Sequence, residues 1–126
     1  MIKMYTSVAG VFLLSTATTA TAQNMPLQTF FLKAEALEKR GALALLSSDY
    51  KLLRREMQTS AAQLRNERLA AAKARTKPAY CPPTSTPLTS EEIVTHFRAI
   101  PVAARLKMST RDGFRSLLAK KYPCPA

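Results

Sequence analysis

The chain has 126 residues, with 19 Lys or Arg against 8 Asp or Glu, and its formal net charge is +11. With 47% hydrophobic and 21% charged residues, the composition is that of an ordinary globular chain, which argues against a disordered polyelectrolyte and against a multi-pass membrane protein. A closed zinc site needs roughly four ligands. Because the chain has one His and two Cys, we expect no metal and no other cofactor.

The first 22 residues have the three parts of a secretory signal peptide. Lys3 gives a basic start, residues 8–14 form an apolar core, and Ala20-Thr21-Ala22 matches the site that signal peptidase cleaves. The apolar core is much shorter than the ~20 residues that cross a bilayer, although an uncleaved anchor remains an alternative. We expect cleavage after Ala22, export from the cytoplasm, and a mature chain that carries +10 and has no transmembrane segment.

The first helix is predicted over about 26–40. Asn24 can cap exposed N–H groups, and Pro26 is tolerated in a first turn because its missing donor costs nothing there. Apolar residues then recur at helical spacing until Gly41, which is a plausible stop. Residues 42–46 are apolar and could form one more turn before Ser47-Ser48-Asp49, whose side chains can cap the next helix.

A long helix is predicted over about 49–75. This segment lacks Gly and Pro and is rich in Ala, Leu, Arg, Gln and Glu, which are good helix formers. At 1.5 Å per residue it would be a rod of roughly 39 Å with a narrow apolar stripe. We expect its C-terminal half to project from so small a domain. Two shorter helices that fold back on each other are the alternative.

The chain divides at residues 77–89, where four prolines favour a stiff, extended linker. Thr89 and Glu92 have the spacing of a capping box, which predicts a helix over 90–99. Pro101 ends that helix, a turn follows through 102–107, and a second helix is predicted over about 110–121.

No segment shows sustained alternation of apolar and polar residues, so the fold is predicted to be all-α. The expected organisation is a small helical domain with one long helix and a disulfide-stapled C-terminal helical hairpin. Its parts are listed in chain order: a signal peptide over 1–22, an N-terminal helical region over 23–76, a Pro-rich linker over 77–89, and the helical hairpin over 90–126.

The two cysteines are predicted to form a disulfide. Helices over 90–99 and 110–121 with a short connection become antiparallel neighbours, and Cys81 and Cys124 lie just outside the two ends that this brings together. Thiols of an exported protein are normally oxidised. A redox-active pair is the alternative, but the Cys-x-x-Cys spacing that tunes thiol reactivity is absent.

Nothing in the sequence predicts an enzyme. His96 is the only imidazole, and no nucleophile or metal-binding motif surrounds it, so we interpret it as a structural histidine. The carboxylates of Glu91 and Glu92 are explained by their place at the start of a helix.

The excess of positive charge is spread over both halves of the mature chain and suggests an acidic partner. An acidic protein is the first expectation, and an anionic envelope surface is the second. Nucleic acid is not expected, because no nucleic-acid-binding motif is present. The candidate partner-binding residues crowd the C-terminal segment; they are Arg98, Arg105, Lys107, Arg111 and Arg115.

The C-terminal segment also has a recognisable order of features. It runs through Cys81-Pro82-Pro83, a helix capped at Thr89, Pro101, paired apolar residues in a second helix, and a terminal Tyr122-Pro123-Cys124. This order resembles the C-terminal part of the Rap/Tai family of periplasmic immunity proteins, which are small, helical, disulfide-bonded proteins that block peptidoglycan amidase effectors of type VI secretion. The resemblance covers about 44 residues; a further cysteine expected upstream is missing, and the helix over 49–75 is not part of the family pattern.

Two functions therefore follow as hypotheses. The first is an exported protein-binding module, either secreted or in the periplasm, where the resemblance implies the periplasm and implies immunity or inhibition of an envelope hydrolase. The second is a cationic, envelope-associated protein that binds anionic lipid or polymer through the long helix.

Overall fold

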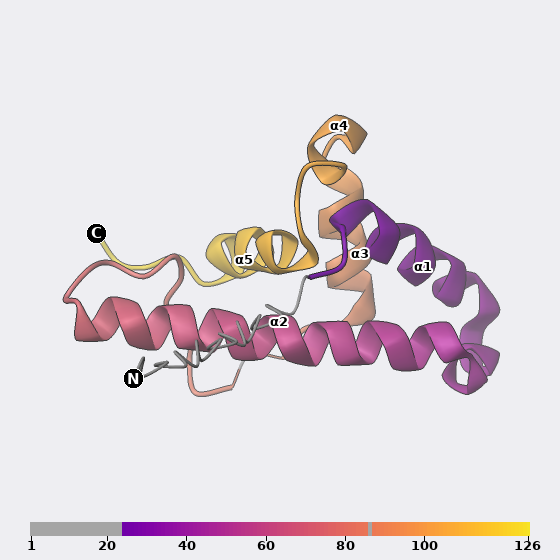
Figure 1. Cartoon of the computed structure of the whole chain (residues 1–126), viewed down its shortest axis with the longest axis horizontal. Coiled ribbons are helices and arrows are strands. Elements are labelled where there is room, and N and C mark those ends of the chain that lie inside the picture. Colours follow the sequence, from indigo (N-terminus) through magenta and orange to yellow (C-terminus); the bar gives the residue numbers. More distant parts are fainter. Residues whose placement is uncertain (1–23, 86) are drawn as a thin grey trace, which may run out of the picture.

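The computed structural model describes residues 24–85 and 87–126, which form helices and no strands, as predicted. The expected signal peptide lies outside these residues. No helix within them is long and apolar enough to cross a bilayer. The elements in chain order are α1 (Leu27–Arg40), the 3-10 helix η1 (Gly41–Leu46), α2 (Ser48–Lys73), α3 (Ser90–Ala99), α4 (Val102–Arg105) and α5 (Thr110–Lys121) (Figure 1).

Helix α1 begins where the chain is tied to the start of α5. The Leu27 N–H donates to the Met108 carbonyl at 2.9 Å, and the Thr110 N–H donates to the Met25 carbonyl at 2.8 Å. These two bonds join segments that are more than 80 residues apart in the sequence. The helix ends at Gly41, whose φ of 59° lies in the left-handed region that glycine adopts without strain.

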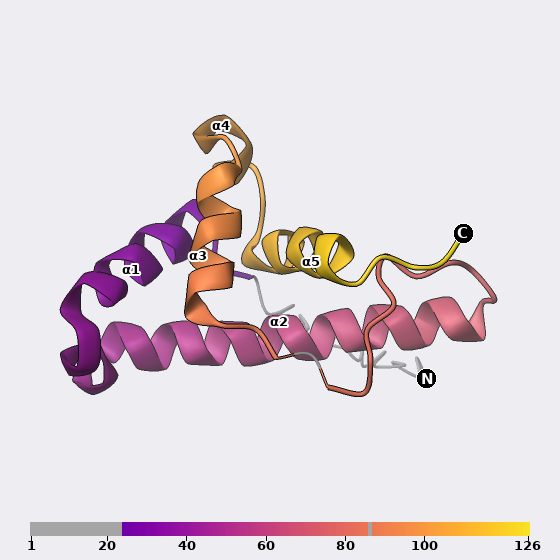
Figure 2. The same ribbon diagram turned by 180° about the vertical axis from the view of Figure 1, so that it is seen from behind.

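Helix α2 is one continuous rod along one edge of the molecule, which excludes the alternative of two shorter helices (Figures 1 and 2). The Ser47 hydroxyl caps it by accepting from the Tyr50 N–H at 3.1 Å. Its C-terminal half does not project freely. Helix α5 packs along it, Leu64 is buried, and the Arg68 guanidinium lies 5.2 Å from the centre of the Tyr80 ring.

The core is centred on three phenylalanine rings. Phe30 of α1, Phe97 of α3 and Phe114 of α5 meet edge to face, with ring centres 5.3 to 5.9 Å apart. Gly113 allows α5 to come this close, because a Cβ there would lie 2.7 Å from the Leu27 side chain. Among the described residues, the core and the apolar residues packed against it lie between Met25 and Tyr122.

The C-terminal segment is stapled as predicted. Cys81 and Cys124 form a disulfide with their Cα atoms 4.8 Å apart, and the Cys81 N–H donates to the Tyr122 carbonyl at 2.9 Å. Lys121 at the end of α5 reaches Glu92 in the first turn of α3 at 2.6 Å. The two ends therefore meet as expected, although α3 and α5 cross rather than run alongside each other (Figure 1). Helix α4 forms within the turn that was expected over 102–107.

Replacing both Cys81 and Cys124 with Ser should lower the free energy of unfolding by about 4 kcal/mol, because the bridge closes a long loop in the unfolded chain. Urea denaturation of the oxidised protein and of the double variant measures this difference. A reducing agent should shift the unfolding midpoint of the wild-type protein to that of the variant. An unchanged midpoint in both experiments would contradict the role of the bridge.

Candidate functional site

The structure distributes the five predicted partner-binding cations over very different surroundings. Arg105 is only 6% exposed, and its guanidinium donates to the Phe97 carbonyl at 2.9 Å. The same group stacks over the Phe31 ring, 4.1 Å from its centre. Arg105 thus holds the C-terminal end of α3 against α1. Its assignment as an exposed partner-binding residue is wrong, because long-range packing buries it.

The other four cations lie nearer the surface, and three of them pair with acids. Arg98 pairs with Glu35 of α1 at 3.2 Å. Arg111 and Arg115 both approach the Glu67 carboxylate of α2, Arg111 at 3.8 Å and Arg115 through its Nε at 3.0 Å. Lys107 is exposed and forms no ion pair within the described residues. The structure therefore does not gather these residues into one cationic patch.

Arg105→Ala should lower the free energy of unfolding by about 3 kcal/mol, because it removes a charged hydrogen bond and a cation–π contact from a buried position. Lys107→Ala, two residues away, should change it by less than about 0.5 kcal/mol. Chemical denaturation of both variants measures the contrast. Similar effects of the two substitutions would contradict the structural role of Arg105.

A different cationic surface is found on α2. It exists because all three acids of this helix lie on the opposite side. Asp49, Glu56 and Glu67 are separated by 7 and 11 residues, which are close to two and three whole turns, so they occupy one side of the helix. Each of them has a partner from another segment. Asp49 binds Lys33 at 2.9 Å, Glu56 accepts from the Met25 N–H at 2.7 Å, and Glu67 binds α5.

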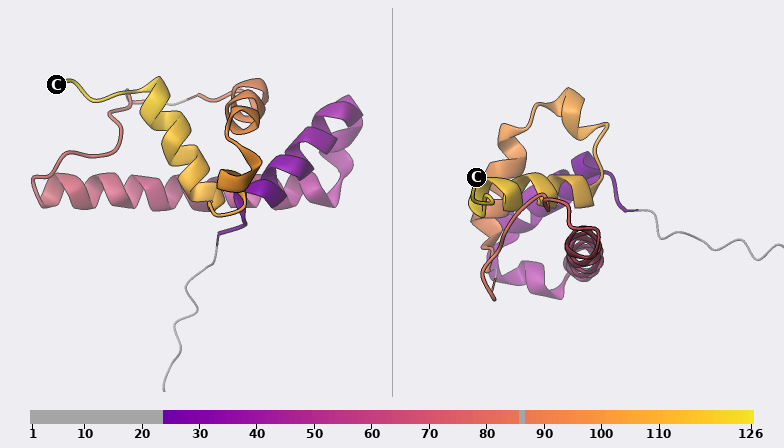
Figure 3. Two further views of the ribbon diagram at one scale, coloured as in Figure 1. Left: turned by 90° about the horizontal axis from the view of Figure 1, so that it is seen from above. Right: turned by 90° about the vertical axis from the view of Figure 1, so that its left-hand side faces the viewer.

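The opposite side of α2 carries cations and no acid. Viewed along α2, the other helices lie to one side of it (Figure 3, right), so no other described helix covers this outer face. Its cations are exposed and form no ion pair within the described residues. Lys51 and Lys73 are 22 residues apart, or about 33 Å along the helix. We call this surface the α2 cationic face; its members are Lys51, Arg54, Arg55, Arg65 and Lys73.

The α2 cationic face begins beside a group of exposed leucines in η1. Leu43, Leu45 and Leu46 are 73%, 58% and 83% exposed. Ala44 is the only residue of η1 that is buried. Three exposed leucines within four residues are unusual for a surface that contacts only water. We call these three residues the leucine corner.

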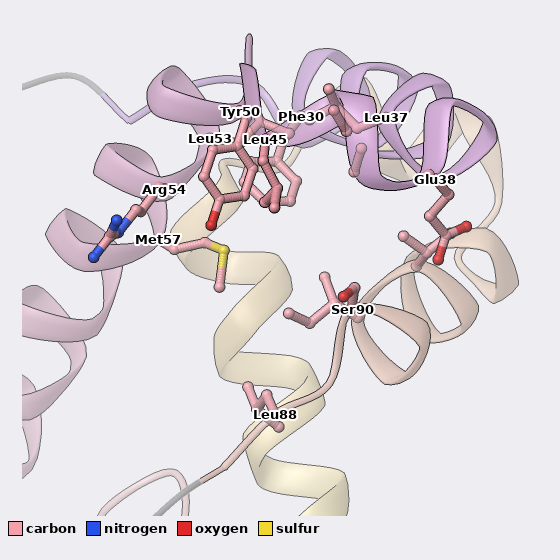
Figure 4. A pocket seen from close by; sticks show the side chains of 15 residues that line it. Phe30, Leu37, Glu38, Leu45, Tyr50, Leu53, Arg54, Met57, Leu88 and Ser90 are labelled. Carbon is pink, nitrogen blue, oxygen red and sulfur yellow. The ribbon is translucent and has the colours of Figure 1, made fainter. Parts of the chain in front are cut away.

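An apolar groove of about 420 Å³ opens next to the leucine corner, between α1, η1, α2 and α3. Figure 4 shows the Leu45, Phe30 and Tyr50 side chains gathered on one side of it, with Arg54 and Glu38 at opposite edges. A volume of this size lies within the range of small-ligand sites. Its lining is mainly apolar, and the charged groups of Arg54 and Glu38 lie at its rim.

His96 lies in a second, more polar depression between α3 and α5. Its Nε2 is 2.8 Å from the Ser116 hydroxyl, which in turn donates to the Gly113 carbonyl. Burial lowers the pKa of His96 below its ordinary value, and the nearby Lys120 ammonium lowers it further. Since the Ser116 proton is directed to a backbone carbonyl, this pair has the geometry of a link between two helices.

The lowered pKa of His96 predicts a dependence of stability on pH. The unfolded chain takes up a proton at the ordinary histidine pKa of about 6.5, and the folded protein does so only at a lower pH. Stability from this group is therefore complete above pH 6.5 and is lost as the pH falls towards the folded pKa. The urea midpoint should fall between pH 7 and pH 5 in the wild-type protein and fall less in His96→Gln. Equal pH dependence in both proteins would contradict this assignment.

Comparison with protein-family models, with curated proteins and with solved structures gives no match. The resemblance to the Rap/Tai family therefore stays a prediction.

The α2 cationic face and the leucine corner were not among the predicted site residues. The spacing of the three acids in α2 was a signal for the first, since it separates acidic from cationic positions on the helix. The exposure of the corner had no comparable signal, because residues 42–46 are equally suited to a buried turn.

Proposed function

We propose that the protein is an exported, non-enzymatic binding module that docks on an anionic surface through the α2 cationic face. The observation that carries this proposal is the separation of charge on α2. Every acid of the helix is bound to another segment of the fold, while five cations on the opposite face are exposed and unpaired within the described residues. This surface adds attraction for an anionic partner at little cost in stability.

Export is supported by two independent features. The first 22 residues have the pattern of a signal peptide. The disulfide between Cys81 and Cys124 is of the kind that persists outside the reducing cytosol. Both an acidic polypeptide and an anionic lipid surface have the charge that the α2 cationic face attracts.

Lys51→Gln combined with Lys73→Gln should weaken binding to phosphatidylglycerol vesicles and to soluble poly-L-glutamate. Each lysine near an anionic surface contributes about 1 kcal/mol, so the pair should cost about 2 kcal/mol, or roughly thirtyfold in affinity. Co-sedimentation measures vesicle binding, and fluorescence anisotropy measures poly-L-glutamate binding. Both are done with the oxidised protein from residue 23 at low and at moderate salt.

The matched control is Lys107→Gln combined with Lys120→Gln. It removes the same charge and the same residue type from exposed positions away from α2. Binding that weakens equally in the two double variants would show attraction by net charge alone and would contradict a docking role for the α2 cationic face. Absence of salt-sensitive binding to either probe would contradict the proposed function as a whole.

A second candidate function is the binding of a protein partner, with immunity or inhibition implied by the resemblance to the Rap/Tai family. The observation that favours it is an exposed apolar patch in and just after α4. Val102 and Leu106 are 50% and 65% exposed and are close in sequence to Lys107, which forms no ion pair with any residue that the structure describes. Such a patch suits the centre of a small protein interface better than a freely solvated turn.

This second function predicts a complex that resists salt. Affinity capture from envelope extract should retain one protein in equal stoichiometry at high salt, and Leu106→Asp should abolish its retention while leaving vesicle binding unchanged. Retention that is equal for the wild-type protein and the variant would exclude the α4 patch as the interface.

A further inference from the structure

We infer that the anionic surface is a lipid bilayer and that the leucine corner inserts into its interfacial region. This inference rests on the proposed function and names the class of partner for the α2 cationic face. The corner is the connection between α1 and α2, at the end of the molecule where the cationic face begins (Figure 1).

The first argument is the amount of apolar surface that the corner exposes. Leu43, Leu45 and Leu46 project from a short 3-10 helix whose only buried residue is Ala44. Burial of apolar surface lowers the free energy by roughly 25 cal/mol per Å². Most of the surface of these three leucines is not buried by the fold, so its burial by a partner would be favourable. A bilayer interface can take up all three side chains without any change in the fold.

The second argument is the charge around the corner. The last turn of α1 and the first two turns of α2 carry exposed cations that form no ion pair within the described residues. Of the two acids in this part of the chain, Asp49 is bound to Lys33, and only Glu38 is left. The cations that surround the leucines are Lys39, Arg40, Lys51, Arg54 and Arg55.

Together these features match the chemistry of an anionic bilayer surface. Phosphate head groups lie at the level of the cations, and the acyl chains begin just below, within reach of leucine side chains. A soluble acidic polypeptide has the charge to bind the cations, but it has little apolar surface on which the leucines could be buried. An apolar tip without cations would lack the attraction to anionic head groups, so the coincidence of the two features favours lipid.

The sequence contains no tryptophan, so a single introduced tryptophan reports the position of the corner without interference. Leu46→Trp places the probe in the corner, and Leu106→Trp is the matched control at another exposed leucine. Each oxidised protein from residue 23 is mixed with phosphatidylglycerol vesicles, with phosphatidylcholine vesicles and with poly-L-glutamate. Emission wavelength and quenching by brominated acyl chains are measured.

The expected result is a blue shift and acyl-chain quenching for Leu46→Trp on phosphatidylglycerol vesicles only. The control Leu106→Trp should keep the emission of a water-exposed indole under the same conditions. Equal quenching at both positions, or a water-exposed signal at position 46 on vesicles that do bind the protein, would overturn the inference and leave the proposed function standing. Failure to bind both phosphatidylglycerol and poly-L-glutamate would overturn both.

A second set of variants tests the energetic role of the leucines. Substitution of Leu43, Leu45 and Leu46 by Ser should weaken binding to phosphatidylglycerol vesicles by roughly tenfold or more and leave poly-L-glutamate binding unchanged. The matched control replaces three exposed apolar residues outside α2 and η1 by Ser, at Leu32, Val102 and Leu106. Equal loss in the two triple variants, or equal loss with both probes, would contradict insertion of the corner. Circular dichroism verifies that each variant is folded.

Discussion

The rotation of α2 about its own axis determines which of its side chains face the other helices and which face solvent. The charge of the protein surface depends on this one constraint. The helix has a weak apolar face, with Leu53 and Leu64 as its only buried leucines. Polar contacts supply what the apolar face lacks. Three acids on one side bind the segment before α1, α1 itself and α5. Partly exposed ion pairs contribute little to the net free energy of folding, but these two ion pairs and the Glu56 hydrogen bond together define which side of the helix faces inward. The outward face of α2 then carries Lys and Arg side chains and no acid, so this face is cationic.

The remaining helices provide the rigid body against which α2 is set. The rings of Phe30, Phe97 and Phe114 join α1, α3 and α5, and Gly113 permits their close approach. Arg105 binds the C-terminal end of α3 through the Phe97 carbonyl. The disulfide joins the linker before α3 to the residues that follow α5. A stiff support matters for recognition, since a docking surface that is held in place loses less entropy when it binds.

Local signals predicted the fold, whereas the surroundings of the cations depended on contacts that such signals do not contain. Helix boundaries follow from Ser47, Thr89, Ser109 and Gly41, which act within a few residues of their own position. Arg115, in contrast, pairs with an acid 48 residues away. Arg105 is buried because α1 happens to cross above it. Counting charges along the chain could identify an excess of cations but could not decide which of them remain available to a partner.

The positive charge of α2 affects the stability of this helix. Lys51, Arg55, Arg65 and Lys73 repel one another along one face, and no acid of the described residues reduces that repulsion. An anionic surface that binds the folded protein removes the repulsion and therefore stabilises α2 against unfolding. The disulfide between Cys81 and Cys124 stabilises the fold independently of this charge, because it acts by constraining the unfolded chain.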